Sequence, residues 1–307
     1  MINTIPPNEF HFAGHDTFHL RYTWLPKAAD YLKNNSGVKV SLSTYDTLMI
    51  ELGIGKNMAK ALRHWAESSQ LFQKDRDGTL SYHTFTDLGE IIFNDDNGLD
   101  RYLELPSTIW LLHYLINSNH KKNSLWYYLF NVFNEHVIKK EEFLFSASNW
   151  FADQGKDDIN QNTIGSDFLC CMMMYNNDKS LSDNISTNMI SSPLKELKLI
   201  KKIGQDYRLR SITTKEIPLG VFSYCLLDYL DSEGSQSFTP FLDLLSGAKS
   251  PGRIFRITES NLVEYLIDFK KITNGHYDFD NTAGMQQLIK VKDEKIDKFE
   301  ILKIDYV

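Results

Sequence analysis

Apolar positions recur at helical spacing in two consecutive segments near the N-terminus. The first segment is Tyr45–Leu52, and the second follows directly after the break at Gly53-Ile54-Gly55. This spacing predicts two short helices joined by a tight turn. The apolar face of the second predicted helix consists of Met58, Ala61, Leu62 and Trp65.

A predicted hairpin and a third helix follow. Leu71-Phe72 and residues 80–83 suit strands, and Asp75–Gly78 between them supplies an Asp-Gly turn. Thr84-x-x-Asp87 then resembles a helix start that leads into residues 88–93. Helix, turn, helix, hairpin and helix is the order of a winged helix-turn-helix, whose second helix enters the major groove. Winged helices also mediate protein contacts, so this alternative stays open.

A fainter copy of the pattern occupies residues 188–210, where Ser192-Pro193 caps a short helix and residues 200–209 suit a second wing. A purely structural helix and hairpin explain it equally well. Most of the remaining segments are apolar enough for helices: Ser107–Leu115, Leu125–Phe133, Leu219–Leu230, Phe238–Leu245 and Asn261–Phe269. We therefore predict a mainly helical α+β protein. A winged-helix domain would span residues 1–116, and a mainly helical domain would span residues 117–307.

Composition and charge narrow the functional classes. The 307 residues include 42% hydrophobic ones, enough for a sizeable core, and carry a net charge of −7. No apolar run of transmembrane length and no signal peptide occurs, so we expect a cytoplasmic protein. An acidic protein contacts DNA only through local basic patches. The candidates on the predicted helix and wing are Lys56, Asn57, Lys60, Arg63 and Arg76.

The densest group of reactive side chains is His15, Asp16, His19 and Arg21. In a helix, the two histidines would share a face with metal-ligand spacing. Asp16 could hold Mg²⁺, and Arg21 could hold a phosphate. Hydrolysis of a phosphodiester needs a metal, a base and a cation, and all three residue types are present. Alternatively, the histidines lock this segment onto the core and Asp16 caps a helix.

Two later motifs are weaker candidates. Ser250-Pro251-Gly252-Arg253 is a turn whose arginine, with Arg256, suits a phosphate, unless the two arginines pair with Glu259 and Asp268. Asp278 and Asp280 would share one face of a strand and could hold a divalent cation. A solvent-exposed turn that caps the next helix is the alternative.

The N-terminal motifs are similar to those of a bacterial family of SspB-type DNA nickases. The resemblance covers nearly the whole chain and is most specific in its first two motifs. Where the family more often has Glu, this chain has Asp16, a shorter carboxylate that can still bind a metal. The motifs are Phe12-x-Gly14-His15-x-Thr17-Phe18-x-x-Arg21-x-x-Trp24-x-x-Lys27, Leu52-Gly53-x-Gly55-Lys56-Asn57-Met58-x-x-Ala61-x-Arg63-x-Trp65, Thr86-x-Leu88-Gly89, Leu103-Glu104, Ser192-Pro193-Leu194, Ser250-Pro251-Gly252-Arg253 and Thr282-Ala283-Gly284.

This resemblance implies an Mg²⁺-dependent nickase that acts on double-stranded DNA in single-strand phosphorothioate modification and phage defence. It also implies three protein partners, namely a cysteine desulfurase, an ATP-pyrophosphatase-type protein and an ATPase. The alternative function is a non-catalytic winged-helix adaptor that binds DNA and recruits these partners. The acidic net charge and the lack of a compact nuclease motif favour the adaptor.

Overall fold

The two helices predicted at the start of the chain are both present. The structure is a computed structural model that describes residues 5–176, 191–234, 236–281, 284 and 286–306. Helix α2 (Tyr45–Leu52) has the predicted bounds, and α3 (Lys56–Ser68) follows it. Gly53 ends α2 with a φ of 62°, in the left-handed region that glycine adopts without steric cost. An earlier helix, α1 (Trp24–Asn34), packs against α3 and was not predicted.

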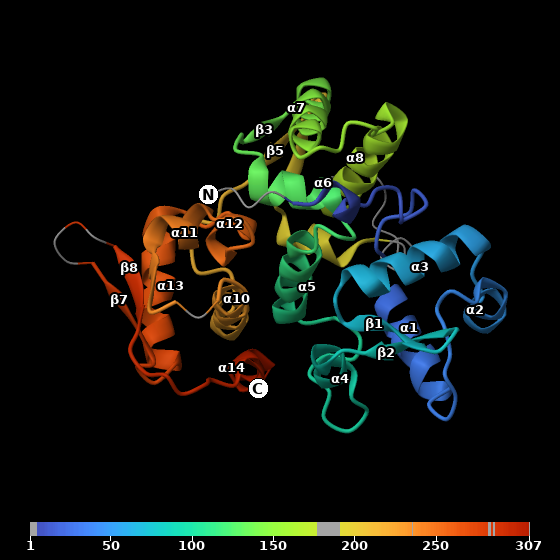
Figure 1. Ribbon diagram of the computed structural model, residues 1–307, viewed down its shortest axis with the longest axis horizontal. Helices are drawn as coiled ribbons and strands as arrows, with labels where there is room; N and C mark the ends of the chain where they lie inside the picture. The colour runs from blue at the N-terminus through green and yellow to red at the C-terminus, as the bar shows by residue number, and fades with distance from the viewer. Residues whose placement is uncertain (1–4, 177–190, 235, 282–283, 285, 307) are drawn as a thin grey trace.

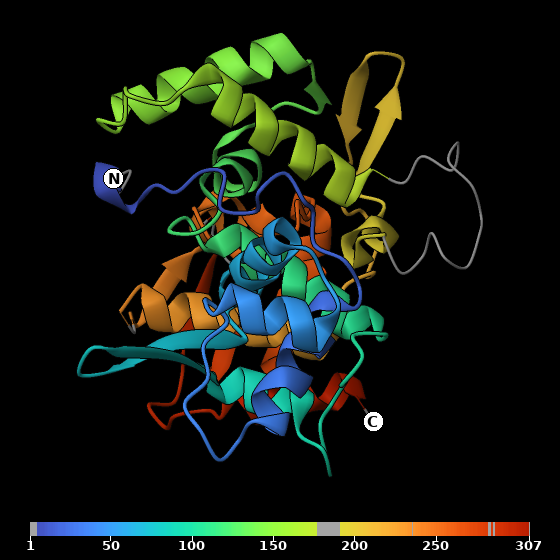
Figure 2. The same cartoon turned by 90° about the vertical axis from the view of Figure 1, so that its right-hand side faces the viewer.

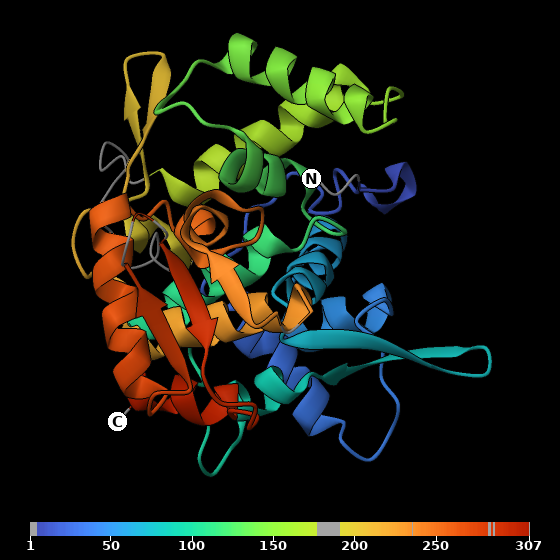
Figure 3. The same ribbon diagram turned by 60° about the vertical axis from the view of Figure 1, so that its left-hand side comes forward.

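The hairpin and the helix after it differ from the prediction in detail. Strands β1 (Phe72–Asp77) and β2 (Leu80–Phe85) are antiparallel, so the turn is shorter than Asp75–Gly78. Helix α4 (Asp87–Phe93) is capped by Thr86, whose side chain accepts from the Gly89 amide, whereas Thr84 lies in β2. Hairpin β1–β2 projects from the body of the molecule (Figure 3).

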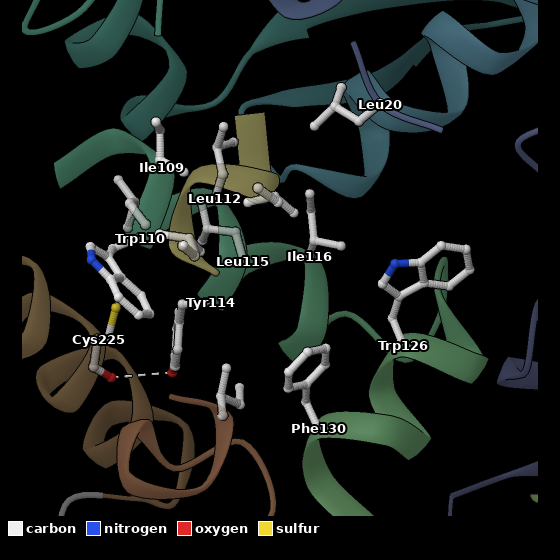
Figure 4. Packing of buried hydrophobic residues seen from close by; sticks show 14 of the residues in the cluster. Leu20, Ile109, Trp110, Leu112, Tyr114, Leu115, Ile116, Trp126, Phe130 and Cys225 are labelled. Carbon is white, nitrogen blue, oxygen red and sulfur yellow. Dashed lines mark hydrogen bonds between the residues drawn. The ribbon is translucent and has the colours of Figure 1, made fainter. Parts of the chain in front are cut away.

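The core is centred on α5 (Pro106–Ser118), which lies in the middle of the molecule (Figure 1). Residues 107–117 of this helix are all buried. Around it, Figure 4 shows Trp110 and Tyr114 near Cys225, with the Tyr114 hydroxyl donating to the Cys225 carbonyl at 3.2 Å. The predicted boundary at residue 116 falls inside this helix. The predicted helix at Leu125–Phe133 is divided into α6 (Ser124–Tyr127) and the π-helix η2 (Tyr128–Val132).

The second wing-like hairpin is present as predicted. Ser192 caps the 3-10 helix η3 (Pro193–Leu197) through its side chain, although residues 188–190 lie outside the described residues. Strands β4 (Ile200–Ile203) and β5 (Asp206–Leu209) then pair, and β3 (Val137–Ile138) joins them in the order β3-β5-β4. Helices α7 (Lys140–Asp153) and α8 (Gln161–Tyr175) lie beside this sheet (Figure 2).

The rest of the chain is helical around a third small sheet, of order β6-β8-β7. The helix predicted at Phe238–Leu245 is wrong in its first part, because Phe238–Pro240 pairs with β8 as a strand. No helix in the described ranges is long and apolar enough to cross a membrane. These observations confirm the mainly helical α+β class. The remaining elements are η1 (Pro7–Glu9), α10 (Leu219–Ser232), β6 (Phe238–Pro240), α11 (Phe241–Ser246), α12 (Pro251–Ile254), α13 (Glu259–Ile272), β7 (Tyr277–Asp280), β8 (Gln287–Lys290), α14 (Lys298–Lys303) and η4 (Ile304–Tyr306).

Candidate functional site

The motif at residues 13–17 is a strained loop and not a helix, so the helical spacing considered for His15 and His19 does not apply. Ala13, Asp16 and Thr17 have φ values of 58°, 48° and 69°. Left-handed backbone is rare outside glycine, and a β-branched residue such as Thr17 is an outlier there. Such strain persists only where surrounding contacts hold it, and it is concentrated at functional sites.

A buried carboxylate on α8 holds this loop in place. Asp167 accepts from the Nε2 of His15 at 2.9 Å and from the backbone N–H of Ala13 at 3.0 Å. The Nδ1 of His15 accepts the Thr17 amide at 3.1 Å, so Nε2 carries the ring proton and donates it. Both nitrogens of this buried ring are therefore engaged in fixing the loop. This geometry matches the alternative in which the histidine locks the segment onto the core.

Gly14 lets the loop approach α3 closely. A Cβ atom at this position would lie 2.4 Å from Nδ1 of His64 and 2.8 Å from Nε2 of His11. His64 is buried against Trp65, with ring centroids 4.8 Å apart. Burial, together with the neighbouring His15, lowers the pKa of His64 well below its usual value. The neutral imidazole ring of His64 thus lies against Gly14 and leaves no room for a side chain at this position.

Asp16 points to the first half of α3, where the predicted DNA-contacting residues lie. Its carboxylate is 3.1 Å from the Nζ of Lys60, and both side chains are about one-third exposed, at 32% and 36%. Arg63, one turn further along, lies over the ring of Tyr45 and within 3.8 Å of Glu67. Lys56 and Asn57 are exposed in the first turn of α3. The loop and the helix thus bring a carboxylate and several cations onto one surface.

Arg21 and His19 complete the N-terminal group. The guanidinium of Arg21 lies 5.0 Å from the ring centroid of Trp24 and 5.6 Å from that of Phe18. Burial lowers the pKa of Arg21, and its Nε forms no hydrogen bond among the described residues. His19 is half-buried. An arginine held by aromatic rings keeps the N–H donors of its planar guanidinium available for a phosphate.

A second charged group on α3 was not predicted. Glu67 accepts from the Nε2 of His83 at 3.1 Å and from the Nζ of Lys122. Burial raises the pKa of Glu67, but hydrogen bonds from these two groups outweigh it and lower the pKa to about 2. The three residues come from α3, β2 and the loop after α5, so sequence spacing gave no signal for the group. It ties the hairpin and the loop at residues 119–123 to α3.

The other predicted residues lie elsewhere. Arg76 is exposed on β1, near the hairpin tip. Arg253 donates to the carbonyls of Asn131 and Phe133 at 3.0 and 2.9 Å, so much of its donor capacity serves the fold. Asp268 pairs with Lys215 and Lys271, so it is not the partner considered for the arginines.

The candidate carboxylate pair near the C-terminus does lie in a strand, β7, as one alternative required. Asp278 forms an ion pair with Lys270 at 2.9 Å, and Asp280 is half-buried. Thr282 and Ala283 of the neighbouring motif lie outside the described residues. Asp278 and Asp280 thus lie in a strand as one alternative required, but Lys270 already neutralises the charge of Asp278.

Within the described ranges, no group of three or more His, Cys, Asp or Glu side chains could hold a metal ion. Mg²⁺ in nucleases and polymerases often binds one or two carboxylates and is completed by water and substrate phosphates. A single carboxylate such as Asp16, about one-third exposed beside Lys60, fits Mg²⁺ only in that manner. A groove of about 590 Å³ between α1, β2 and α4 contains none of the predicted site residues.

Comparisons with known proteins agree with the resemblance found in the motifs. The family described as a protein of unknown function, DUF4007, matches residues 12–306. The fold is similar to that of a crystal structure of magnesium ion-bound SspB (TM-score 0.80) and to another SspB crystal structure (TM-score 0.81). In both cases the identity is 22%, and the match covers 98% of this chain and 90% of the other chain. No curated protein matches the sequence.

Proposed function

Because the chain belongs to the DUF4007 family and shares its fold with SspB, we propose that it is a magnesium-dependent DNA nickase of single-strand phosphorothioate modification. The observation that supports this best is the strained loop at residues 13–17. Hydrogen bonds from His15 and Ala13 to Asp167 of α8 hold it in place, and it presents Asp16 beside Lys60 of α3. Strain of this kind is maintained where a side chain must be held in one position.

We further propose that residues 1–116 act as a winged-helix DNA-binding domain and residues 117–307 as a second, mainly helical domain. The order α1, α2, α3, β1, β2 and α4 supports the winged helix, as does a backbone hydrogen bond of 2.9 Å from His83 on β2 to the carbonyl of Val40. This bond ties the hairpin to the segment that precedes α2. In the proposal, α3 enters the major groove, with Lys56, Asn57, Lys60 and Arg63 toward the DNA, and Arg76 contacts the backbone.

The reacting phosphate would lie over the loop at residues 13–21. Asp16 would hold Mg²⁺ together with water and phosphate oxygens, and the ion would neutralise phosphate charge and acidify a bound water. Arg21 would donate its planar fork to the phosphate, and His19 would serve as a base or phosphate contact. His15 fixes the loop, since both of its ring nitrogens are already hydrogen-bonded.

The test is the relaxation of supercoiled plasmid by the purified chain with and without Mg²⁺. We expect nicked circles with wild type and a rate at least about 100-fold lower with Asp16→Asn. The exposed Asp157 is the matched control, so Asp157→Asn should nick like wild type. Equal relaxation by wild type and Asp16→Asn would show that Asp16 is not the metal ligand.

The second candidate function is a DNA adaptor that recruits the modification proteins without cutting. The acidic net charge of −7 favours it, because it limits DNA contact to local basic patches. It predicts that wild type binds duplex DNA but does not nick it with Mg²⁺, and that Arg63→Ala binds more weakly. A cysteine desulfurase, an ATP-pyrophosphatase-type protein and an ATPase are the proposed partners in either case, and co-purification would test them.

A further inference from the structure

Hairpin β4–β5 carries a concentration of positive charge on an acidic protein. Lys201 and Arg208 lie directly opposite each other in the antiparallel register, and Lys202, the next residue along β4, points to the other face of the hairpin. All three are exposed. Like charges directly opposite on a sheet destabilise it, because their Cβ atoms are only about 5 Å apart. A sheet that keeps this pair gains stability when an anion lies across it.

Nearby acids do not neutralise these residues. The ion pairs of the surrounding described residues join Lys139 to Glu142 and Arg210 to Glu216. Asp206 pairs with Ile203 two positions nearer the tip of the hairpin, on the same face as Arg208, and forms no ion pair with it among the described residues. No ion pair within the described residues involves Lys201, Lys202 or Arg208, so their charges are available.

The base of the same sheet adds a further cation. Arg256 has a φ of 56° and contacts the exposed His136, with its Nη2 3.3 Å from the ring Nδ1. Its Nε is buried and forms no hydrogen bond in the part of the chain that the structure describes. Burial and the charge of Arg253 lower the pKa of Arg256 to about 10, so the guanidinium still carries its charge at neutral pH. A further positive charge therefore lies at the base of this sheet, next to His136.

The loop at residues 13–22 connects this surface to α3. On one side, Asp16 pairs with Lys60 of α3. On the other side, the Tyr22 hydroxyl donates to Glu196 of η3, and the Tyr22 amide donates to the Ser191 carbonyl at 3.2 Å. Helix η3 leads directly into β4, and the hairpin projects freely beyond it (Figure 2). The candidate site thus lies between α3 and hairpin β4–β5.

We propose that hairpin β4–β5 is a second element that binds the phosphate backbone of DNA, separate from α3, with Lys201 and Arg208 on one face of the hairpin and Lys202 on the other. The surface contacts phosphates without reading bases, because lysine and arginine side chains on an exposed strand offer point charges to any sequence. Ile200 and Leu209 are buried at the foot of the hairpin and fix its position. This inference rests on the proposed DNA-handling function but not on nicking.

The test is the salt dependence of binding of the full chain to a fluorescent 30-base-pair duplex, measured by anisotropy in EDTA. We expect Lys201→Gln/Lys202→Gln/Arg208→Gln to lower affinity at least about tenfold and to reduce the log–log salt slope by about 2 to 3. The control, Lys271→Gln/Lys292→Gln/Lys295→Gln, removes the same charge from exposed positions elsewhere. It should leave both quantities near the wild-type values.

A charge-conserving variant, Lys201→Arg/Lys202→Arg/Arg208→Lys, should bind like wild type and separates charge from folding. If the glutamine variant and its control weaken DNA binding equally, the inference is wrong. Binding of an acidic protein by the same residues would not rescue it. Plasmid nicking is measured separately. If wild type binds DNA through the hairpin but does not nick plasmid, the nickase proposal is refuted and the proposed surface stands. If wild type nicks normally and the glutamine variant keeps the wild-type salt slope, the proposed surface is refuted and the nickase proposal stands.

Discussion

Removal of the Asp167 carboxylate should release the strained loop and destabilise the fold. Asp167 is 2% exposed and accepts from His15 Nε2 and the Ala13 amide. In Asp167→Ala, the buried Nε2 of His15 loses its acceptor, which costs about 1–3 kcal/mol, and the part-buried Ala13 amide loses an ordinary hydrogen bond worth about 1 kcal/mol. We therefore expect a loss of about 2–4 kcal/mol in the free energy of unfolding, a large share of the roughly 5–15 kcal/mol of a typical protein.

The conservative variant sharpens this prediction. In Asp167→Asn, the amide oxygen can replace Oδ1, the atom that accepts from both His15 and Ala13. The other carboxylate oxygen, 3.3 Å from the Ala13 amide, becomes an NH₂ group that faces a donor. The loss should therefore be smaller, about 1–2 kcal/mol, because the charge assistance disappears while the hydrogen bonds remain.

Urea unfolding followed by tryptophan fluorescence is the assay, since Trp65 and Trp126 pack on His15 with ring centroids 6.0 and 5.5 Å apart. Hydrogen exchange of residues 11–24 should rise in Asp167→Ala more than in the rest of the chain. Asp157→Ala, at an exposed position, is the control. An Asp167→Ala protein within about 0.5 kcal/mol of wild type, with unchanged exchange in this segment, would refute the view that Asp167 holds the loop.

Three further variants test the same region. Gly14→Ala should cost about 1–3 kcal/mol, because the added methyl overlaps the buried His64; a wild-type melting temperature would contradict the close approach. Glu67 has a folded pKa of about 2, below its ordinary 4.5, so its stabilisation is present above pH 4.5 and is lost as the pH falls toward 2. Glu67→Gln should therefore flatten the pH dependence of urea unfolding in that window, and an unchanged slope would count against the cluster. Trp65→Phe removes a 2.9 Å hydrogen bond to the Phe18 carbonyl and should cost about 1–2 kcal/mol, whereas an unaltered urea midpoint would show that water replaces the bond.

Local patterns of apolar spacing predicted only part of the fold. Helices α2 and α3 and hairpin β4–β5 were found because their apolar spacing and turn residues act within a few positions. Helices α1 and α8 were not predicted. In α8, Leu169 and Met173 are exposed, at 50% and 45%, while its other face is also apolar, so apolar spacing does not mark one face. Helix α5, in contrast, is buried on all faces and was predicted from its run of apolar residues.

The candidate site was predictable in composition but not in geometry. His15 and Asp16 were singled out because they are close together in sequence, but the shape of their loop depends on Asp167, 152 residues away from His15. No helical periodicity describes three residues with positive φ. The group around Glu67 could not be predicted from the sequence for the same reason, since His83 and Lys122 come from other elements. Long-range hydrogen bonds to a few buried carboxylates decide where these side chains lie.

The acidic net charge and the basic surfaces fit one electrostatic scheme. With a net charge of −7, most of the protein surface repels a duplex, and the repulsion is screened beyond about 10 Å at 0.1 M salt. In the proposed scheme, attraction comes from the exposed start of α3, with Lys56, and from hairpin β4–β5, with Lys201 and Arg208. DNA drawn to both surfaces would cross the loop that connects them and pass Asp16. A protein with this distribution would bind weakly and with strong salt dependence, but in one orientation, which suits a reaction confined to one strand.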